Sequence, residues 1–139
     1  MDKNVRSADV SRATSETEIK ISLVLDGSGK AAVSTGIGFL DHMLTAFARH
    51  GGFDLTLNCR GDLEVDGHHT VEDIGICLGQ ALRQCIGDGT GIGRYGNAFI
   101  PMDEALVQVV VDLCGRSFVT HNLKFPQERV GDLDSCLIV

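Results

Sequence analysis

The stretch that decides the fold reads Asp66-Gly67-His68-His69-Thr70-Val71-Glu72-Asp73 and continues to Ile86 with apolar residues at Ile74, Cys77, Leu78, Ala81, Leu82 and Cys85. The apolar residues recur with the 3.6-residue period of an amphipathic helix, so a long helix is predicted from His69 to about Ile86. One face of such a helix must be covered by other apolar surface, and the segments around it alternate as sheet strands do. The sequence therefore predicts an α/β (α+β) fold.

The segments outside this helix divide into strands and one further helix. A second amphipathic pattern predicts a helix over residues 39–50, which Gly51-Gly52 ends. Asp26-Gly27-Ser28-Gly29 is typical of a hairpin turn, which would return Lys30–Ser34 against the first strand. The predicted strands are Thr17–Leu25, Lys30–Ser34, Phe53–Cys59, one that begins at Phe99, Leu106–Leu113 and Phe118–Phe125.

A weak internal repeat appears when the chain is compared with itself at a shift of 86 positions, which places Glu18 over Glu104. Each copy has an acidic residue, a β-rich run and then an aspartate. One interpretation is a duplicated α/β unit in a single domain over residues 1–139, with residues 1–97 as the first repeat and residues 98–139 as an incomplete second repeat. The other is that unrelated hairpins look alike at this level of comparison.

Composition and charge limit the classes of function. A net charge of −7 argues against a general nucleic-acid binder and against a membrane-surface binder. The five cysteines have no CxxC spacing, which indicates reduced thiols in a cytoplasmic protein and no disulfide framework. No apolar run approaches ~18 residues, so no membrane span is predicted.

The histidines and acids at the start of the predicted long helix have the spacing of metal ligands. His68 and Glu72 lie at i and i+4 on one helix face, and His69 and Asp73 form a second such pair, rotated by roughly 100°. Nitrogen and hard oxygen donors without a thiolate suit Mn, Fe or Zn better than a structural zinc site of the cysteine type. The alternative is a polar helix start whose acids favour the helix dipole.

Four residues elsewhere are candidates for related roles. His42 follows a glycine turn beside Asp41 and could supply a third ligand, although a capping or solvated histidine is the alternative. Arg94 and Arg116 stand in glycine-bracketed turns, where they are either phosphate clamps or solvated cations. Glu16, before the first predicted strand, is either an acid/base group or an exposed acid at a strand edge.

Together these segments resemble the imidazoleglycerol-phosphate dehydratase family. The matching elements occur in family order along the whole chain: Arg12-x-Thr14-x-Glu16-Thr17, Gly38-Phe39-Leu40-Asp41-His42-Met43, Asp66-x-His68-His69-Thr70-x-Glu72-Asp73, Gly91-Ile92-x-Arg94, Pro101-Met102-Asp103-Glu104-Ala105-Leu106 and Gly115-Arg116. The resemblance implies a duplicated, two-layer unit of mixed sheet and helices of the ribosomal-S5-domain-2-like type. It also implies a homo-oligomer of twenty-four subunits, with active sites between subunits and no nucleic-acid or membrane partner.

The same resemblance implies the reaction and the residues that perform it. The enzyme would be a lyase of histidine biosynthesis that converts D-erythro-imidazole glycerol phosphate to imidazole acetol phosphate and water, with two Mn²⁺ per active site. His42, His68 and Glu72 would hold one ion, and His69 would contribute to the other. Glu16 would be the acid/base group, and Arg94 and Arg116 would contact the substrate phosphate.

The family pattern also contains elements that these 139 residues do not show. They are a second helix with a histidine, a second His-His-x-x-x-Glu segment, and serine and lysine contacts to phosphate. We therefore expect at most one well-liganded Mn²⁺ site in this chain. Besides the dehydratase, two hypotheses stay open: a catalytically incompetent fragment that binds metal or assembles, and an unrelated small metal-binding module.

Overall fold

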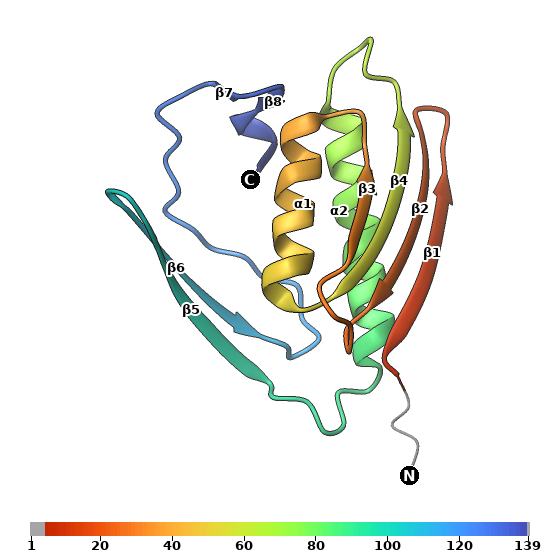
Figure 1. Ribbon diagram of the computed structural model, residues 1–139, viewed down its shortest axis with the longest axis vertical. Helices are drawn as coiled ribbons and strands as arrows, with labels where there is room; N and C mark the ends of the chain where they lie inside the picture. Colours follow the sequence, from red (N-terminus) through yellow and green to blue (C-terminus); the bar gives the residue numbers. More distant parts are fainter. Residues whose placement is uncertain (1–4, 139) are drawn as a thin grey trace. The chain divides into compact units, whose positions relative to one another are not determined.

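The computed structural model describes residues 5–138 (Figure 1). The chain divides into two compact units, of which the first comprises the residues up to Cys85 together with those from Lys124 onward. The second unit comprises Ile86–Leu123. Each unit is described by itself below.

A four-stranded sheet forms the frame of the first unit. Its strands are β1 (Ser7–Ala13), β2 (Thr17–Val24), β3 (Ala31–Ser34) and β4 (Asp54–Gly61), in the order β1-β2-β4-β3. β2 pairs antiparallel with both β1 and β4, whereas β3 pairs parallel with β4. Residues of β2 are alternately buried and exposed, so one face of the sheet carries the core and the other faces solvent.

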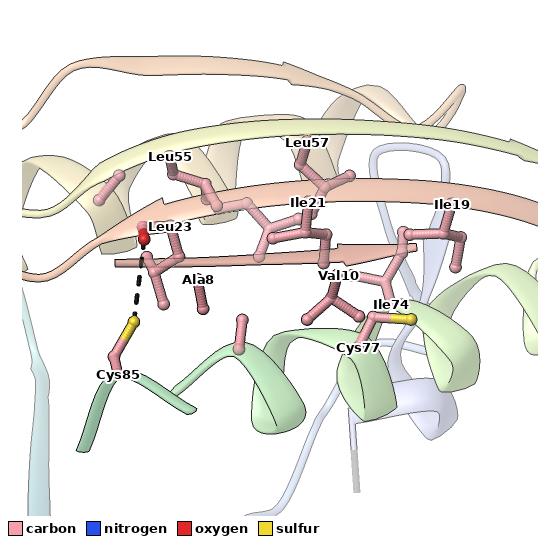
Figure 2. Packing of buried hydrophobic residues seen from close by; sticks show 13 residues of the cluster. Ala8, Val10, Ile19, Ile21, Leu23, Leu55, Leu57, Ile74, Cys77 and Cys85 are labelled. Atoms are coloured by element: carbon pink, nitrogen blue, oxygen red, sulfur yellow. Dashed lines mark hydrogen bonds between the residues drawn. The ribbon is translucent and has the colours of Figure 1, made fainter. Parts of the chain in front are cut away.

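Two helices, α1 (Gly38–Gly51) and α2 (His68–Ile86), cover one face of this sheet (Figure 1). Both match the predicted helices, and α1 ends as expected at Gly52, which has the left-handed φ of 71°. The core between sheet and helices consists of small and branched apolar side chains (Figure 2): Ala8, Val10, Ile19, Ile21, Leu23, Leu44, Ala48, Leu55, Leu57, Ile74, Cys77, Ala81 and Cys85. Burying each of the larger ones contributes about 1.5–3 kcal/mol.

The amino end of α1 is capped by a residue from far along the chain. The residue at the cap position, Ile37, provides no side-chain hydrogen bond. The carboxylate of Asp132 instead accepts the N–H groups of Gly38 and Phe39, at 2.6 and 2.8 Å. Asp132 lies between the short strands β7 (Arg129–Val130) and β8 (Leu133–Asp134), which the 3₁₀ turn Ser135–Ile138 follows. These bonds tie the last segment of the first unit to its first helix.

The predicted hairpin between the segments Thr17–Leu25 and Lys30–Ser34, which correspond to β2 and β3, is wrong. β3 does not pair with β2, because β4 occupies that position in the sheet. The turn before β3 is held against the start of β4, since Asp54 Oδ1 accepts the N–H groups of Ser28 and Lys30 at 2.8 and 3.0 Å. These two N–H groups hold the pKa of Asp54 below its usual range. β1 was not predicted, because only Ala8 and Val10 point into the core from this polar edge strand.

The second unit contains one hairpin, in which β5 (Tyr95–Met102) pairs antiparallel with β6 (Ala105–Asp112). Its turn places Asp103 at a φ of 50°. The predicted strand Phe118–Phe125 is wrong, because residues 116–125 form no strand ladder. An alternating pattern produces a strand only where the segment pairs with a neighbouring strand, and residues 118–125 pair with none of the described strands.

The mixed α+β architecture agrees with the expected fold, and its arrangement is consistent with a repeated unit. A shift of 86 positions carries β2 onto residues that overlap β6, and each is the second strand of an antiparallel hairpin. The boundary between repeats at residues 97 and 98 stays a prediction. All five cysteines are free, as expected. Within residues 5–138 no helix is long and apolar enough to cross a membrane.

Candidate functional site

The start of α2 is fixed by its own preceding loop. Asp66 Oδ1 accepts the N–H of His68 at 2.7 Å, and the carbonyl of Gly67 accepts the N–H of Val71 at 3.0 Å. A carboxylate at this position satisfies a backbone donor that the helix leaves free and favours the positive end of the helix dipole. The loop therefore presents His68 and His69 in the first turn of the helix, as the sequence predicts.

His68 and Glu72 converge on one side of this turn. The imidazole Nε2 lies 3.5 Å from Glu72 Oε2, and both side chains are more than half exposed. Two donors that each lie about 2.0–2.2 Å from one ion are themselves about 3–3.5 Å apart at ordinary coordination angles. The spacing of this pair therefore suits two ligands of one metal ion, and its exposure leaves room for further ligands.

His69 points to a different carboxylate, that of Asp62 in the loop after β4. The imidazole Nδ1 lies 3.0 Å from Asp62 Oδ2. Because an ionised carboxylate only accepts, Nδ1 carries the hydrogen and Nε2 is left free to bind a metal when the ring is neutral. The hydrogen bond with Asp62 raises the pKa of His69, and the charges of Asp62 and Glu16 act in the same direction.

The sequence does not single out Asp62, which is one of three acids, with Glu64 and Asp66, in the segment before His69. Its other oxygen, Oδ1, is buried and has no hydrogen-bond partner among residues 5–138. No periodic pattern marks a residue of this kind, because the contact depends on how β4 leads into α2.

Asp73 does not join His69 as the second i, i+4 pair that the sequence suggested. Its side chain is buried, and Oδ1 accepts the Arg12 Nε–H at 2.8 Å. Oδ2 accepts the hydroxyl of Thr17 at 2.5 Å. Asp73 therefore connects α2 to the sheet and is not available as a metal ligand.

Glu16 lies in the turn between β1 and β2, half-buried at the rim of a surface hollow of about 380 Å³ that Asp62 also lines. The Ser15 hydroxyl, 2.6 Å from Glu16 Oε1, holds the pKa of Glu16 below its usual range, and Thr14 contributes in the same direction. The charge of His69 has a smaller effect of the same sign. Glu16 is thus a carboxylate whose negative charge acts on His69 at the histidine end of α2.

His42 is exposed in the first turns of α1, with the Phe39 ring at 6.3 Å. The neighbouring Asp41 does not serve His42. Its Oδ1 accepts both the N–H and the hydroxyl of Thr35, at 2.8 and 2.6 Å. Within the described part of the chain no three His, Cys, Asp or Glu side chains converge as a metal cluster, so His42 does not join His68 and Glu72 in one copy.

Arg94 and Arg116 belong to the second unit and share one neighbour, Asp112. Arg94 donates to the two oxygens of Asp112 at 2.7 and 3.1 Å, and its guanidinium lies 4.9 Å from the centre of the Tyr95 ring. These hydrogen bonds hold the pKa of Asp112 below its usual range, and the charge of Arg116 adds to the effect. Arg116 itself lines a hollow of about 690 Å³ with Ser117, Thr120 and the carboxylate of Asp112. An anion at this hollow would meet the guanidinium of Arg116 together with the negative charge of Asp112, which the donors of Arg94 partly offset.

Fold and site together define an α+β protein in which two adjacent histidines and a glutamate open a helix beside a carboxylate-bearing turn. The family model of imidazoleglycerol-phosphate dehydratase matches residues 35–139. The chain belongs to this family.

Named relatives and solved structures agree with this assignment. The chain is 58% identical over 130 residues to imidazoleglycerol-phosphate dehydratase of Gluconobacter oxydans, and the aligned region covers 94% of this chain and 66% of the relative. It is also 58% identical over 134 residues to the imidazoleglycerol-phosphate dehydratase of Heliobacterium modesticaldum, where the aligned region covers 96% of this chain and 69% of the relative. The chain thus spans about two thirds of the length of these relatives.

Among solved structures, the dehydratase of Staphylococcus aureus superimposes with a TM-score of 0.83 at 39% identity, over 95% of this chain and 72% of that one. The dehydratase of Pyrococcus furiosus, solved in complex with (S)-C348, gives a TM-score of 0.69 at 41% identity, over 86% of this chain and 64% of that one. The family and the α+β fold are therefore both established for this chain.

Proposed function

We propose that this chain is a metal-dependent hydro-lyase of histidine biosynthesis, which converts D-erythro-imidazole glycerol phosphate to imidazole acetol phosphate and water. The observation that supports this most directly is the arrangement at the start of α2. His68 and Glu72 approach to 3.5 Å there, while Asp62 orients His69 beside them. The relatives' name describes the same reaction.

The donor set fits a hard or borderline divalent cation such as Mn²⁺, since it combines imidazole nitrogen with carboxylate oxygen. We assign His68 and Glu72 to one ion and His69 to a second. His42, which is exposed on α1, would complete the first set where copies of the chain meet in a homo-oligomer. The bound ions would supply Lewis-acid stabilisation to the imidazole ring of the substrate.

The other residues bind the substrate and move its proton. Glu16 would take the proton that the carbon beside the ring loses, or return it to the departing hydroxyl. Arg116 and Arg94 would hold the phosphate group, Arg116 through free donors and Arg94 after its bond with Asp112 loosens. Asp62 would keep His69 in the tautomer that leaves Nε2 unprotonated.

Turnover by the 139-residue protein tests the proposal. Protein freed of metal and then supplied with Mn²⁺ should convert imidazole glycerol phosphate to the acetol phosphate, detected by mass spectrometry. A Glu16→Gln variant should bind Mn²⁺ as the parent does and lose most of the turnover, by about a hundredfold. Turnover at the parent rate in that variant would remove Glu16 from the mechanism.

A second candidate function is metal binding without catalysis. The observation that favours it is that the described side chains bring together only pairs of donors, and no set of three. A protein that binds Mn²⁺ through His68 and Glu72 but does not convert the substrate, at any Mn²⁺ concentration, would establish this candidate and exclude the first.

A further inference from the structure

Asp73 is a buried carboxylate that the proposed reaction does not use. It lies on the side of α2 that faces the sheet, and its side chain is only 9% exposed. A carboxylate in such a place destabilises the fold unless each of its oxygens is paired. Its partners therefore show what the burial of Asp73 achieves.

Both partners belong to the two strands that flank the turn of Glu16. Arg12, near the end of β1, donates to Oδ1 at 2.8 Å, and Thr17, the first residue of β2, donates to Oδ2 at 2.5 Å. The three residues between β1 and β2 are Thr14, Ser15 and Glu16. Asp73 thus fixes both ends of the turn to one point on α2, one helical turn from His69.

The hydroxyl groups extend this connection to Glu16 itself. The hydrogen of Thr17 Oγ1 is used on Asp73, so Thr14 Oγ1, 3.2 Å away, must be the donor in the bond between the two hydroxyls. Thr14 Oγ1 in turn accepts the N–H of Glu16 at 3.1 Å and that of Thr17 at 2.9 Å. A continuous chain of hydrogen bonds therefore runs from the backbone of Glu16 through two hydroxyls to Asp73.

We propose that Asp73 is a positioning residue, which acts through Thr17 and Thr14 to hold the Glu16 carboxylate beside the histidine end of α2. This inference rests on the proposed function for the role of Glu16. The bonding itself does not depend on that role, because every group in it is present in the chain without substrate or metal. Arg12 balances the buried charge, so that Asp73 stays an acceptor for Thr17.

The test removes one hydroxyl and leaves the shape of the side chain. Thr17→Val breaks the link between Asp73 and the turn, whereas Thr17→Ser retains it. Thr17→Ser is therefore the matched control, since it keeps the hydroxyl at the same buried position. In Thr17→Val we expect kcat to fall about ten- to a hundredfold with KM changed less than about threefold. Thr17→Ser should stay near the parent kcat.

Amide hydrogen exchange gives a readout that needs no turnover. The Glu16 N–H should exchange about tenfold faster in Thr17→Val than in Thr17→Ser. If the parent protein converts no substrate, the proposed function fails while this comparison still decides the positioning role. Equal exchange at Glu16 in the two variants, or a kcat in Thr17→Val equal to that of Thr17→Ser, would overturn the inference.

Thr14→Val is the second variant, and it covers the case in which Thr17→Val does not fold. Thr14 is exposed, so its replacement leaves the core intact. It should reproduce the loss of kcat and the faster exchange at Glu16, and Thr14→Ser should restore both. Parent values of both in Thr14→Val would contradict the proposal.

Discussion

The ring of His69 has one of its nitrogens committed before any ligand arrives. Asp62 lies 3.0 Å from Nδ1, and this hydrogen bond raises the pKa of the ring. The same carboxylate thus has two opposed effects on a metal site. It orients Nε2 toward an incoming ion, and it favours the imidazolium form, which must lose a proton before that ion can bind.

Replacing Asp62 by Asn should lower the pKa of His69 toward its ordinary value of ~6.5. Because the pair with Asp62 raises the pKa of His69 in the folded protein, its stabilisation of the fold is fully present below pH ~6.5, the pKa of the unfolded state. This stabilisation is lost as the pH rises through the pKa of His69 in the folded state. The parent should therefore exceed Asp62→Asn in stability by more at pH ~5 than at pH ~8.

An NMR titration of the His69 ring and urea unfolding at the two pH values would measure both effects. The signal of His121, in the second unit, serves as the internal reference. A stability difference that is the same at both pH values would show that the His69–Asp62 pair does not titrate as described.

The pair His68 and Glu72 makes a direct prediction for metal binding. His68→Ala and Glu72→Gln should each weaken Mn²⁺ binding at least about tenfold, since each removes a donor from one ion. Isothermal titration calorimetry on metal-free protein would measure the change. His50→Ala is the control, because His50 is exposed in the last turn of α1. Binding by His68→Ala as tight as that of the parent would refute the ligand assignment.

At the level of the elements, the end of β4 lies close against the first turn of α2 at Gly61 and Thr70. A Cβ at position 61 would overlap the Thr70 hydroxyl oxygen and lie 3.3 Å from the Thr70 Cβ. Only a residue without a side chain fits there, so Gly61 sets how tightly the loop with Asp62 can turn into α2. The position of the histidines thus depends on a glycine in a strand.

Gly61→Ala should therefore destabilise the protein by about 1–3 kcal/mol through overpacking. Thr70→Ala on its own should cost less, because its hydroxyl has no hydrogen-bond partner among the described residues. In the double variant, removal of the Thr70 oxygen leaves room for the new methyl group. The two changes should then be less destabilising together than the sum of the single changes. Urea unfolding of the four proteins measures this coupling, and strictly additive effects would contradict the close approach.

The helices could be predicted from the sequence, but the order of the strands could not. The period of apolar residues in α1 and α2 is set within each segment, and the glycines after α1 end it in the chain itself. The partner of β3 depends instead on two contacts between distant segments. Helix α1 connects β3 to β4, so that the two strands pair parallel, and Asp54 holds the turn before β3 against the start of β4. Interactions between distant segments leave no periodic signal.

The candidate site divides in the same way. His68 and Glu72 lie one helical turn apart, so their convergence follows from helix geometry alone. Asp73 has the same spacing from His69, but it packs against Arg12 and Thr17 of the sheet. The role of Asp73 depends on which face of α2 packs against the sheet, and the i, i+4 spacing from His69 does not indicate that face.

On the scale of the whole molecule, the two units differ in how well they are covered. In the first unit, two helices cover one face of the sheet and the side chains between them are buried. In the second unit, every residue of β5 and β6 is exposed. A two-stranded hairpin without a covering layer has marginal stability in water.

Amide hydrogen exchange should therefore be faster in β5 and β6 than in β2 and β4. Exchange in the central strands should require unfolding of the whole first unit, while the hairpin should open locally. Exchange followed by mass spectrometry, with peptides that cover residues 17–24, 54–61 and 95–112, would compare them. Equal protection of the two regions would show that the hairpin is covered in solution, and the oligomeric state at the same concentration would then identify a second copy as the cover.

The cap on α1 has a consequence for the time course of synthesis. Gly38 and its acceptor Asp132 are 94 residues apart, so at about 5–20 residues per second a ribosome needs on the order of 5–20 s between them. For that interval water is the only partner for the two N–H groups that Asp132 later binds. The nascent first helix therefore has a frayed leading turn until translation has passed the whole second unit, and a pause in between would prolong the exposure of the His42 end of this helix to chaperones and proteases.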